Sequence, residues 1–235
     1  STGVYWKPIY NLLHPHFDVW VVNAQHLARV PGRKTDESDA EWLTRLMQYG
    51  LLNRSFIPDE WQRDLRDLTR YRTRLLQEKS SNVNRLHKIL QDANIKLTSV
   101  VTDIQGVSAR AMIEALIGNE MDERQMAHLA LGRLRRKLPL LVEALTGWVR
   151  PHHRFMLQQI LHHLDELRER IESLDQQIQA VCAPYATLLA RLDEISGVGR
   201  RTAEIILAEV GPCVEKWPTS GHLASWACVC PGNHE

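Results

Sequence analysis

The chain has 235 residues, 44% hydrophobic and 24% charged, which excludes collagen-like, mucin-like and wholly disordered proteins and allows one large or two small domains. Its 29 Lys and Arg residues nearly balance its 28 Asp and Glu residues, so a nucleic-acid partner has to be argued from local basic patches. No stretch reaches the roughly 18 to 20 apolar residues of a membrane-spanning helix, and the first residues lack the layout of a signal peptide. These features predict a cytoplasmic protein with no membrane partner.

The first fifty residues predict a helix over residues 4–13, a strand over 17–22 and a second helix over 36–52. The loop before the second helix ends in Thr35, a good N-cap residue. Because one strand cannot bury itself, the other strands of such a sheet are expected to precede Ser1, in an α/β domain that is cut there.

Residues 59–93 carry one long helical pattern that no glycine or proline interrupts. Between residues 51 and 100 we count ten Lys and Arg against six Asp and Glu. Taken alone, such a run is typical of a solvated helix face; the alternative is a track for nucleic-acid phosphates.

Residues 95–139 predict several short helices, with Gly106, Gly118 and Gly132 as breaks. Within them lies a basic cluster to which the sequence assigns no role: Arg133, Arg135, Arg136 and Lys137.

Apolar residues then recur over residues 157–181 at alternating spacings of three and four. This repeat predicts a coiled coil, either with the helix over 59–93 or with another subunit. The neighbouring pairs His152–His153 and His162–His163 are interpreted as solvated surface rather than as metal ligands.

The most specific local signal is a Gly197-Val-Gly199-Arg-Arg-Thr202 segment that opens an apolar-periodic helix. It is typical of a DNA-binding helix-hairpin-helix, in which glycines admit a phosphate close to the backbone and the helix N-terminus offers free N–H groups. Arg200 and Arg201 add positive charge, and such contacts bind the duplex without reading bases. The alternative is a plain tight turn between two packed helices.

Asp36 and Asp39 stand three residues apart at the start of a predicted helix, where they share a face. Two carboxylates placed in this way converge on a hard cation such as Mg²⁺. The alternative is that they only complement the helix dipole.

Four cysteines are too few and too clustered for a disulfide scaffold, which favours free thiols. Cys228 and Cys230 are one residue apart instead of the usual two to four, so a zinc site with His222 or His234 is the less favoured alternative. The complete set is Cys182, Cys213, Cys228 and Cys230.

Several motifs agree in their order along the whole chain. They are the opening Ser1-Thr-Gly-Val-Tyr-Trp, a strand, Gly32-Arg-Lys-Thr-Asp36-x-x-Asp39-Ala, a long helix, a coiled coil, the Gly197-Val-Gly199 hairpin and Leu223-Ala-Ser-Trp-Ala227-x-x-x-Pro231-Gly. Together they resemble the DEDD-type transposases of the IS110 family, in particular its IS1111 branch. Cys228 departs from the pattern, since the family usually has glycine there.

The resemblance implies a RuvC-like, RNase H-type domain with four acidic residues, the last two at Asp36 and Asp39, which hold Mg²⁺. It also implies a C-terminal transposase domain with a serine nucleophile. The family's glutamate would precede Ser1 and its serine would follow Glu235, so we expect the chain to be an enzyme's middle, inactive as this fragment. The alternatives are a non-catalytic DNA-binding and dimerisation module and a purely structural coiled-coil protein.

The function implied by the resemblance is DNA transposition by site-specific recombination in the bacterial cytoplasm, on the nucleoid. The implied partners are DNA, a structured guide RNA and further copies of the chain, forming a dimer or tetramer through the coiled coil. The basic helix is then interpreted as a phosphate track.

The expected fold is mainly α: a remnant of an RNase H/RuvC-like α/β domain, long coiled-coil helices and a helical C-terminal domain with a helix-hairpin-helix. The corresponding ranges are residues 1–58, 59–184 and 185–235.

Overall fold

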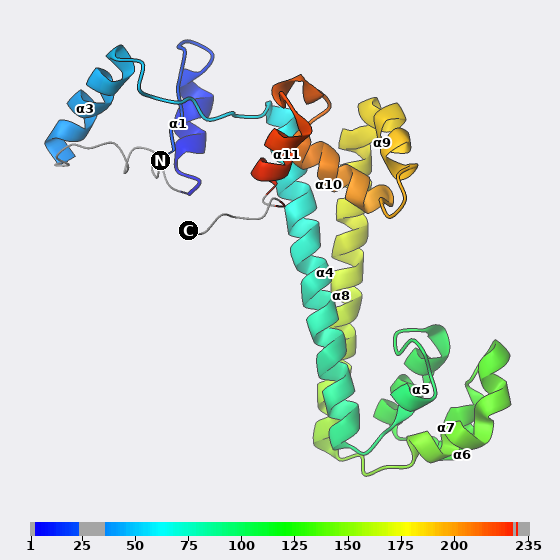
Figure 1. Cartoon of the computed structure of the whole chain (residues 1–235). Helices are drawn as coiled ribbons and strands as arrows, with labels where there is room; N and C mark the ends of the chain where they lie inside the picture. Colours follow the sequence, from blue (N-terminus) through cyan, green and yellow to red (C-terminus); the bar gives the residue numbers. More distant parts are fainter. Residues whose placement is uncertain (1–2, 24–35, 228, 230–235) are drawn as a thin grey trace, which may run out of the picture. The chain divides into compact units, whose positions relative to one another are not determined.

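The computed structural model of the chain describes residues 3–23, 36–227 and 229, without the side chains of residues 36–39 and 214 (Figure 1). Its described part is mainly helical and contains no strand, which confirms a mainly α fold. The α-helices are α1 (Trp6–Leu13), α3 (Asp36–Gln48), α4 (Glu60–Asp92), α5 (Val107–Gly118), α6 (Glu123–His128), α7 (Leu138–Leu145), α8 (Pro151–Cys182), α9 (Ala186–Asp193), α10 (Arg200–Val210) and α11 (Ser220–Trp226). The short 3₁₀ helices are η1 (Leu97–Ser99), η2 (Gly132–Lys137), η3 (Ala183–Tyr185) and η4 (Val214–Lys216).

The contacts divide the chain into two units, Ser1–Glu60 and Trp61–Glu235. In the first unit, the predicted strand over residues 17–22 is wrong: among the described residues of this unit, only Val22 forms a bridge, to Arg54. A β-rich segment becomes a strand only where neighbouring strands pair with it, and one antiparallel bridge does not supply them. The motif residues 32–35 lie outside the described part.

Helix α3 ends four residues before the predicted limit of residue 52. Gly50 adopts a φ of +67°, a left-handed conformation that suits glycine, and the Leu51 amide donates to the Leu46 carbonyl at 2.9 Å. This is the hydrogen-bond pattern of a glycine-terminated helix end, and it explains why the apolar periodicity overestimated the helix.

The second unit is built on α4 and α8, which lie side by side and antiparallel (Figure 1). Midway along the pair, Leu75 of α4 packs against Leu167 and Ile171 of α8. The predicted apolar stripe of α8 therefore packs against α4 of the same chain, which is the intramolecular one of the two alternatives. Pro151 at the first turn of α8 fits the helix start, because its missing N–H has no partner there anyway.

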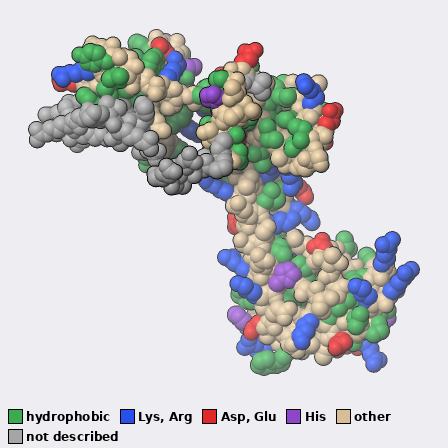
Figure 2. All heavy atoms as spheres, viewed as in Figure 1, with side chains coloured by type: hydrophobic (Ala, Val, Ile, Leu, Met, Phe, Trp, Pro, Cys, Tyr) green, Lys and Arg blue, Asp and Glu red, His purple; other side chains and the backbone are tan. Residues whose placement is uncertain are grey.

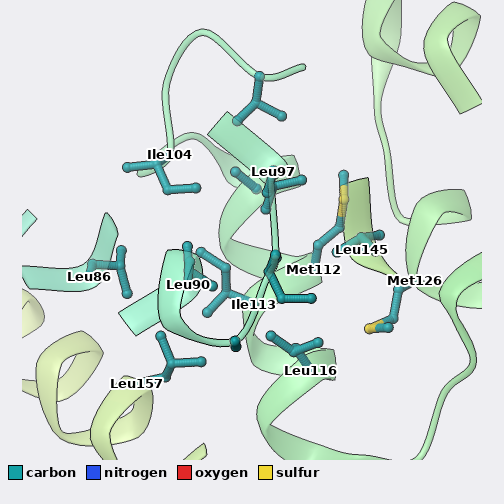
Figure 3. Close-up of a cluster of buried hydrophobic side chains, with 14 of the residues drawn as sticks. Leu86, Leu90, Leu97, Ile104, Met112, Ile113, Leu116, Met126, Leu145 and Leu157 are labelled. Carbon is teal, nitrogen blue, oxygen red and sulfur yellow. The ribbon is translucent and has the colours of Figure 1, made fainter. Parts of the chain in front are cut away.

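The largest apolar core lies where the chain returns from α4 to α8, and helices α5, α6 and α7 complete it (Figure 3). Leu86 and Leu90 come from α4, Met112 and Ile113 from α5, and Leu157 from α8; all are at most 1% exposed. We call this region the α5–α7 end.

A smaller core lies at the other end of the pair, where α9 and α10 pack on it. It joins Leu65 of α4 to Ile178 of α8, Leu189 of α9 and Leu207 of α10, all fully buried. We call this region the hairpin end. The two ends of one helix pair thus carry separate cores.

The interpretation of the four histidines as solvated is wrong for one of them. His153 is fully buried, its Nε2 lies 2.8 Å from Oδ2 of Asp92, and its Nδ1 accepts from the backbone N–H of Arg150. The hydrogen bond with His153 lowers the pKa of Asp92. His153 stands four residues before Leu157, in register with the seam, but the spacing along α8 does not show that the end of α4 covers it.

Candidate nucleic-acid interface

Helices α9 and α10 pack against each other and are joined by a hairpin over residues 194–199. Gly197 adopts a φ of +86°, where a side chain would be strained, and the Val198 amide donates to the Ile195 carbonyl at 2.9 Å. Val198 packs against the core of the hairpin end. The glycine and the valine together explain the sharp turn.

The five residues that the sequence singled out lie together at the tip of this hairpin and at the first turn of α10, and all are exposed. They are Gly197, Gly199, Arg200, Arg201 and Thr202. Gly199 is the N-cap residue of α10 in an extended conformation, and no side chain caps the helix. A Cβ added at Gly199 would meet open space, so the packing of the protein itself does not require glycine there.

The two arginines of the tip are engaged with carboxylates, which sequence reasoning missed. Nε of Arg200 donates to Glu204 at 3.0 Å, and Nη2 of Arg201 donates to Asp175 of α8 at 2.9 Å. The Arg200 and Arg201 side chains remain 47% and 55% exposed. They are therefore accessible cations in ion pairs rather than free charges.

Arg72 of α4 joins these pairs into a network. Its Nη1 donates to Asp175 at 2.9 Å and to Glu204 at 2.7 Å, and its side chain is only 2% exposed. Nη2 of Arg72 is buried without a hydrogen-bond partner in the described part of the chain. The network contains three guanidinium groups and two carboxylates, so it keeps a positive balance at the base of the hairpin.

The sequence did contain a signal that Arg72 is buried and paired. It stands seven residues after Leu65 and three before Leu75, at a position where the apolar stripe of α4 expects a hydrophobic side chain. A charged residue in register with such a stripe is buried only when it is paired.

The C-terminal end of α10 is held by three further side chains of α4. Nε2 of Gln62 and Nε of Arg66 both donate to the Ala208 carbonyl, at 2.9 and 2.8 Å. Arg70 donates through Nε and Nη2 to the two carboxylate oxygens of Glu209, both at 2.8 Å. Burial lowers the pKa of Arg66, whereas the hydrogen bond to Glu209 raises that of Arg70.

These contacts correct the interpretation of α4 as one continuous phosphate track. Arg66, Arg70 and Arg72 hold α10, a role that the count of positive charges did not reveal. Arg74 and Lys88 of α4 are exposed cations. Arg66 and Arg72 are only 17% and 2% exposed, whereas Arg70 is 60% exposed in its pair with Glu209. The exposed cations of α4, Arg70 included, are therefore the candidates for phosphate contact.

Asp36 and Asp39 both lie in the first turn of α3, where residues three apart share a helix face. Their side chains are outside the described part, so their joint role as metal ligands stays a prediction. Among the residues that the structure describes, no cluster of three His, Cys, Asp or Glu could hold a metal ion. Cys182 and Cys213 are free, Cys182 is buried with its pKa raised by burial, and Cys228 and Cys230 fall outside the described part.

Comparison with known proteins identifies the family to which the chain belongs. Residues 1–95, which include Asp36 and Asp39, match the DEDD transposase model of the IS110 group, described as a transposase. Residues 189–235, which include the hairpin tip, match the model described as the transposase IS116/IS110/IS902 family. No curated protein and no solved structure matches the chain, and no described helix is long and apolar enough to cross a membrane. Two models of the same group, in the expected order and covering more than half of the sequence, show that the chain belongs to the IS110 family of transposases.

Proposed function

We propose that this transposase holds duplex DNA with α9, the hairpin and α10, used as a helix-hairpin-helix. DNA transposition is the function of the family. The observation that carries the proposal is the bare backbone at Gly199: the N-terminus of α10 has no capping side chain, and a Cβ there would meet open space. A phosphate fits such a site, because unpaired N–H groups and the positive end of the helix dipole both favour an anion.

The ion pairs of Arg200 and Arg201 suit this role. Both guanidinium groups are about half exposed, so a phosphate oxygen approaching the tip accepts their N–H groups while Arg72 still balances Glu204 and Asp175. Contacts of this kind fix a protein on the sugar-phosphate backbone without reading bases. The hairpin therefore supports binding that is independent of DNA sequence.

The test is equilibrium binding of the chain to several unrelated DNA duplexes. We expect Gly199→Val, and separately Arg200→Ala with Arg201→Ala, to weaken binding to every duplex by a similar factor. Gly118→Val is the matched control, because a Cβ at Gly118 also meets open space and that residue lies in α5. Unchanged binding in both hairpin variants would overturn the proposal, and a loss confined to one duplex would argue for base reading.

We propose further that Asp36 and Asp39 hold Mg²⁺ in the transposition reaction. Their positions in the first turn of α3 place both on one face, and carboxylate oxygens are the ligands that Mg²⁺ prefers. When bound, the ion would polarise a phosphodiester oxygen and position the DNA strand. The role of the two aspartates is to hold the ion there.

This assignment is tested in an active transposase that contains this sequence. Asp36→Asn or Asp39→Asn should abolish recombination and leave the helical content unchanged. Glu37→Gln is the control, because adjacent residues on a helix do not share a face. Full activity in both aspartate variants would remove them from the metal site.

The unit Ser1–Glu60 is proposed to be the C-terminal part of an RNase H-type domain. Tyr10 and Leu46 are buried, but Tyr5, Leu12 and Tyr49 are 81%, 73% and 76% exposed. So much exposed apolar surface in a small unit is typical of a piece that packs against further protein. Limited proteolysis tests this, since cleavage within residues 3–60 should precede cleavage of α4 and α8.

A structured guide RNA and a homo-oligomer remain part of the proposal through the family resemblance. The apolar seam of α8 already packs on α4, so the dimer or tetramer has to use other surfaces than this seam. Sedimentation of the chain with and without DNA measures the oligomeric state; a species that is monomeric under both conditions would contradict the homo-oligomer.

A further inference from the structure

We propose that η2, at the α5–α7 end, is a second contact for the phosphate backbone of duplex DNA. The inference rests on the proposed function as a DNA-binding transposase and adds a site far from the hairpin in sequence. Neither family match covers this segment, which lies between residues 95 and 189. Its four cations are Arg133, Arg135, Arg136 and Lys137.

The first observation is that these cations have no acidic partners. All four are exposed, and within the described part of the chain none forms an ion pair. Several other arginines, on α4, α5, α8 and α10, do pair with carboxylates, whereas η2 gathers four cations within five residues without one such pair. Figure 2 shows Lys and Arg side chains projecting from the surface of the α5–α7 end. Four adjacent positive charges repel one another, so an unpaired cluster of this kind is suited to a polyanion.

The second observation is that the segment is firmly held. Leu134 and Leu138 pack against the core of the α5–α7 end, and Nζ of Lys137 donates to the Val100 carbonyl at 3.2 Å. The Leu131 amide, just before η2, donates to the Ser108 hydroxyl at 2.9 Å. The backbone that carries the cations is thus ordered before any ligand arrives, which reduces the entropy lost on binding.

The third observation is the spacing of the charges. A 3₁₀ helix has three residues per turn, so Arg133 and Arg136 share a face. It rises about 2 Å per residue, so η2 extends about 10 to 12 Å, about three times the 3.4 Å rise along the duplex axis between successive phosphates of one strand. The cluster therefore matches a short run of one strand.

A groove of about 370 Å³ lies beside η2, and Arg133 and Lys137 are among the residues that line it. Thr102 and Ser108 add hydroxyl groups to its lining. Asp103 is the acidic residue of this lining, and its Oδ1 already accepts from the Gln105 amide at 2.9 Å. The two cations and the hydroxyl donors leave the groove suited to a phosphate group.

The test is DNA binding by the full chain in which Arg133, Arg135 and Arg136 are all changed to Gln. The control variant changes three other exposed arginines, Arg124, Arg168 and Arg170, to Gln, and so removes the same charge. Binding of a long duplex is measured over a range of salt concentrations. We expect the η2 variant to bind about tenfold more weakly at low salt and to lower the slope of log affinity against log salt by about 2 to 3, whereas the control changes little.

Thermal unfolding of both variants checks that the fold is intact. Equal slopes in the η2 variant and its control would overturn the inference. A loss of duplex RNA binding with duplex DNA binding unchanged would also overturn it, because the ligand would then be RNA. If both hairpin variants bind normally while the η2 variant fails, the hairpin proposal falls and this one stands. If the hairpin variants fail while the η2 variant behaves as its control, this inference falls and the hairpin proposal stands.

Discussion

The two ends of the α4–α8 pair use arginine in different ways. At the hairpin end, Arg72 is buried between Asp175 and Glu204, and Arg66 and Arg70 bind the C-terminus of α10. At the α5–α7 end, a large apolar core holds the helices together, and the four cations of η2 face solvent.

The difference shows that a count of positive charges does not locate a nucleic-acid surface. The hairpin end has a small apolar core, so ion pairs and hydrogen bonds from α4 carry part of its packing. The α5–α7 end has tertiary arginine contacts too, from Arg110 to Asp165 and from Arg154 to the Leu116 carbonyl, but the three arginines of η2 take no part in them and remain available to a ligand. Four predictions test this contrast, from the largest expected effect to the smallest.

Arg72→Met should destabilise the hairpin end by about 3 kcal/mol, because it removes the buried cation between Glu204 and Asp175 and leaves them only the half-exposed Arg200 and Arg201 as partners. Urea unfolding measures the change. Arg74→Met on the same helix is the control, since Arg74 is exposed. Adding Glu204→Gln to Arg72→Met should restore part of the loss. If Arg72→Met and Arg74→Met are equally stable, the network does not hold α10.

Gly147→Ala should destabilise the α5–α7 end by about 1 to 3 kcal/mol, because its Cβ would collide with the Ala93 carbonyl and with the Ile95 side chain. Hydrogen exchange of the buried amides of α5 reports this change locally. Gly118→Ala is the control, because a Cβ at Gly118 would meet open space. A collision at backbone cannot be relieved by a rotamer change, so a neutral Gly147→Ala would mean that the loop packs differently.

Gly197→Ala and Gly199→Ala should separate backbone strain from ligand contact at the hairpin. Gly197 has a φ of +86°, so alanine there should cost about 1 to 2 kcal/mol of stability. Gly199 has an ordinary φ of −83° and open space, so alanine there should leave stability unchanged and still reduce DNA binding. Thermal unfolding and duplex binding measured on both variants distinguish the two roles. Equal stability losses would show that both glycines serve the turn alone.

Asp92→Asn should cause the smallest loss of stability, and this loss should depend on pH. The hydrogen bond with His153 lowers the pKa of Asp92 in the folded protein. A lowered folded pKa contributes stability above the unfolded pKa of about 3.9, and this contribution is lost as the pH falls through the folded value. The variant should therefore be less stable than the parent at neutral pH, with the difference shrinking below about pH 4. Asp64→Asn, at an exposed position of α4, is the control that makes the same chemical change.

Part of the candidate site could be predicted from the local sequence. The glycines of the hairpin tip predicted a sharp turn between two helices, because a left-handed backbone and an open N-terminus depend on residues that are adjacent in the chain. The ion pairs of Arg200 and Arg201 were not accessible in the same way. Asp175 and Arg72 approach them from helices that are distant in sequence, and charge patterns do not reveal such encounters.

Helical periodicity, glycine breaks and the alternating spacing along α8 already implied long helices and an apolar stripe, since these properties repeat along a single segment. The order of the motifs along the chain, among them Gly32-Arg-Lys-Thr-Asp36-x-x-Asp39-Ala and the Gly197-Val-Gly199 hairpin, carried the resemblance to the family that the comparisons show. Only the folded chain shows which helix covers the stripe and that His153 is buried. It also shows that three arginines of α4 support α10. The reason is physical: burial and pairing depend on groups that lie from 61 to 143 residues apart in the chain, and no local pattern encodes their spatial distances.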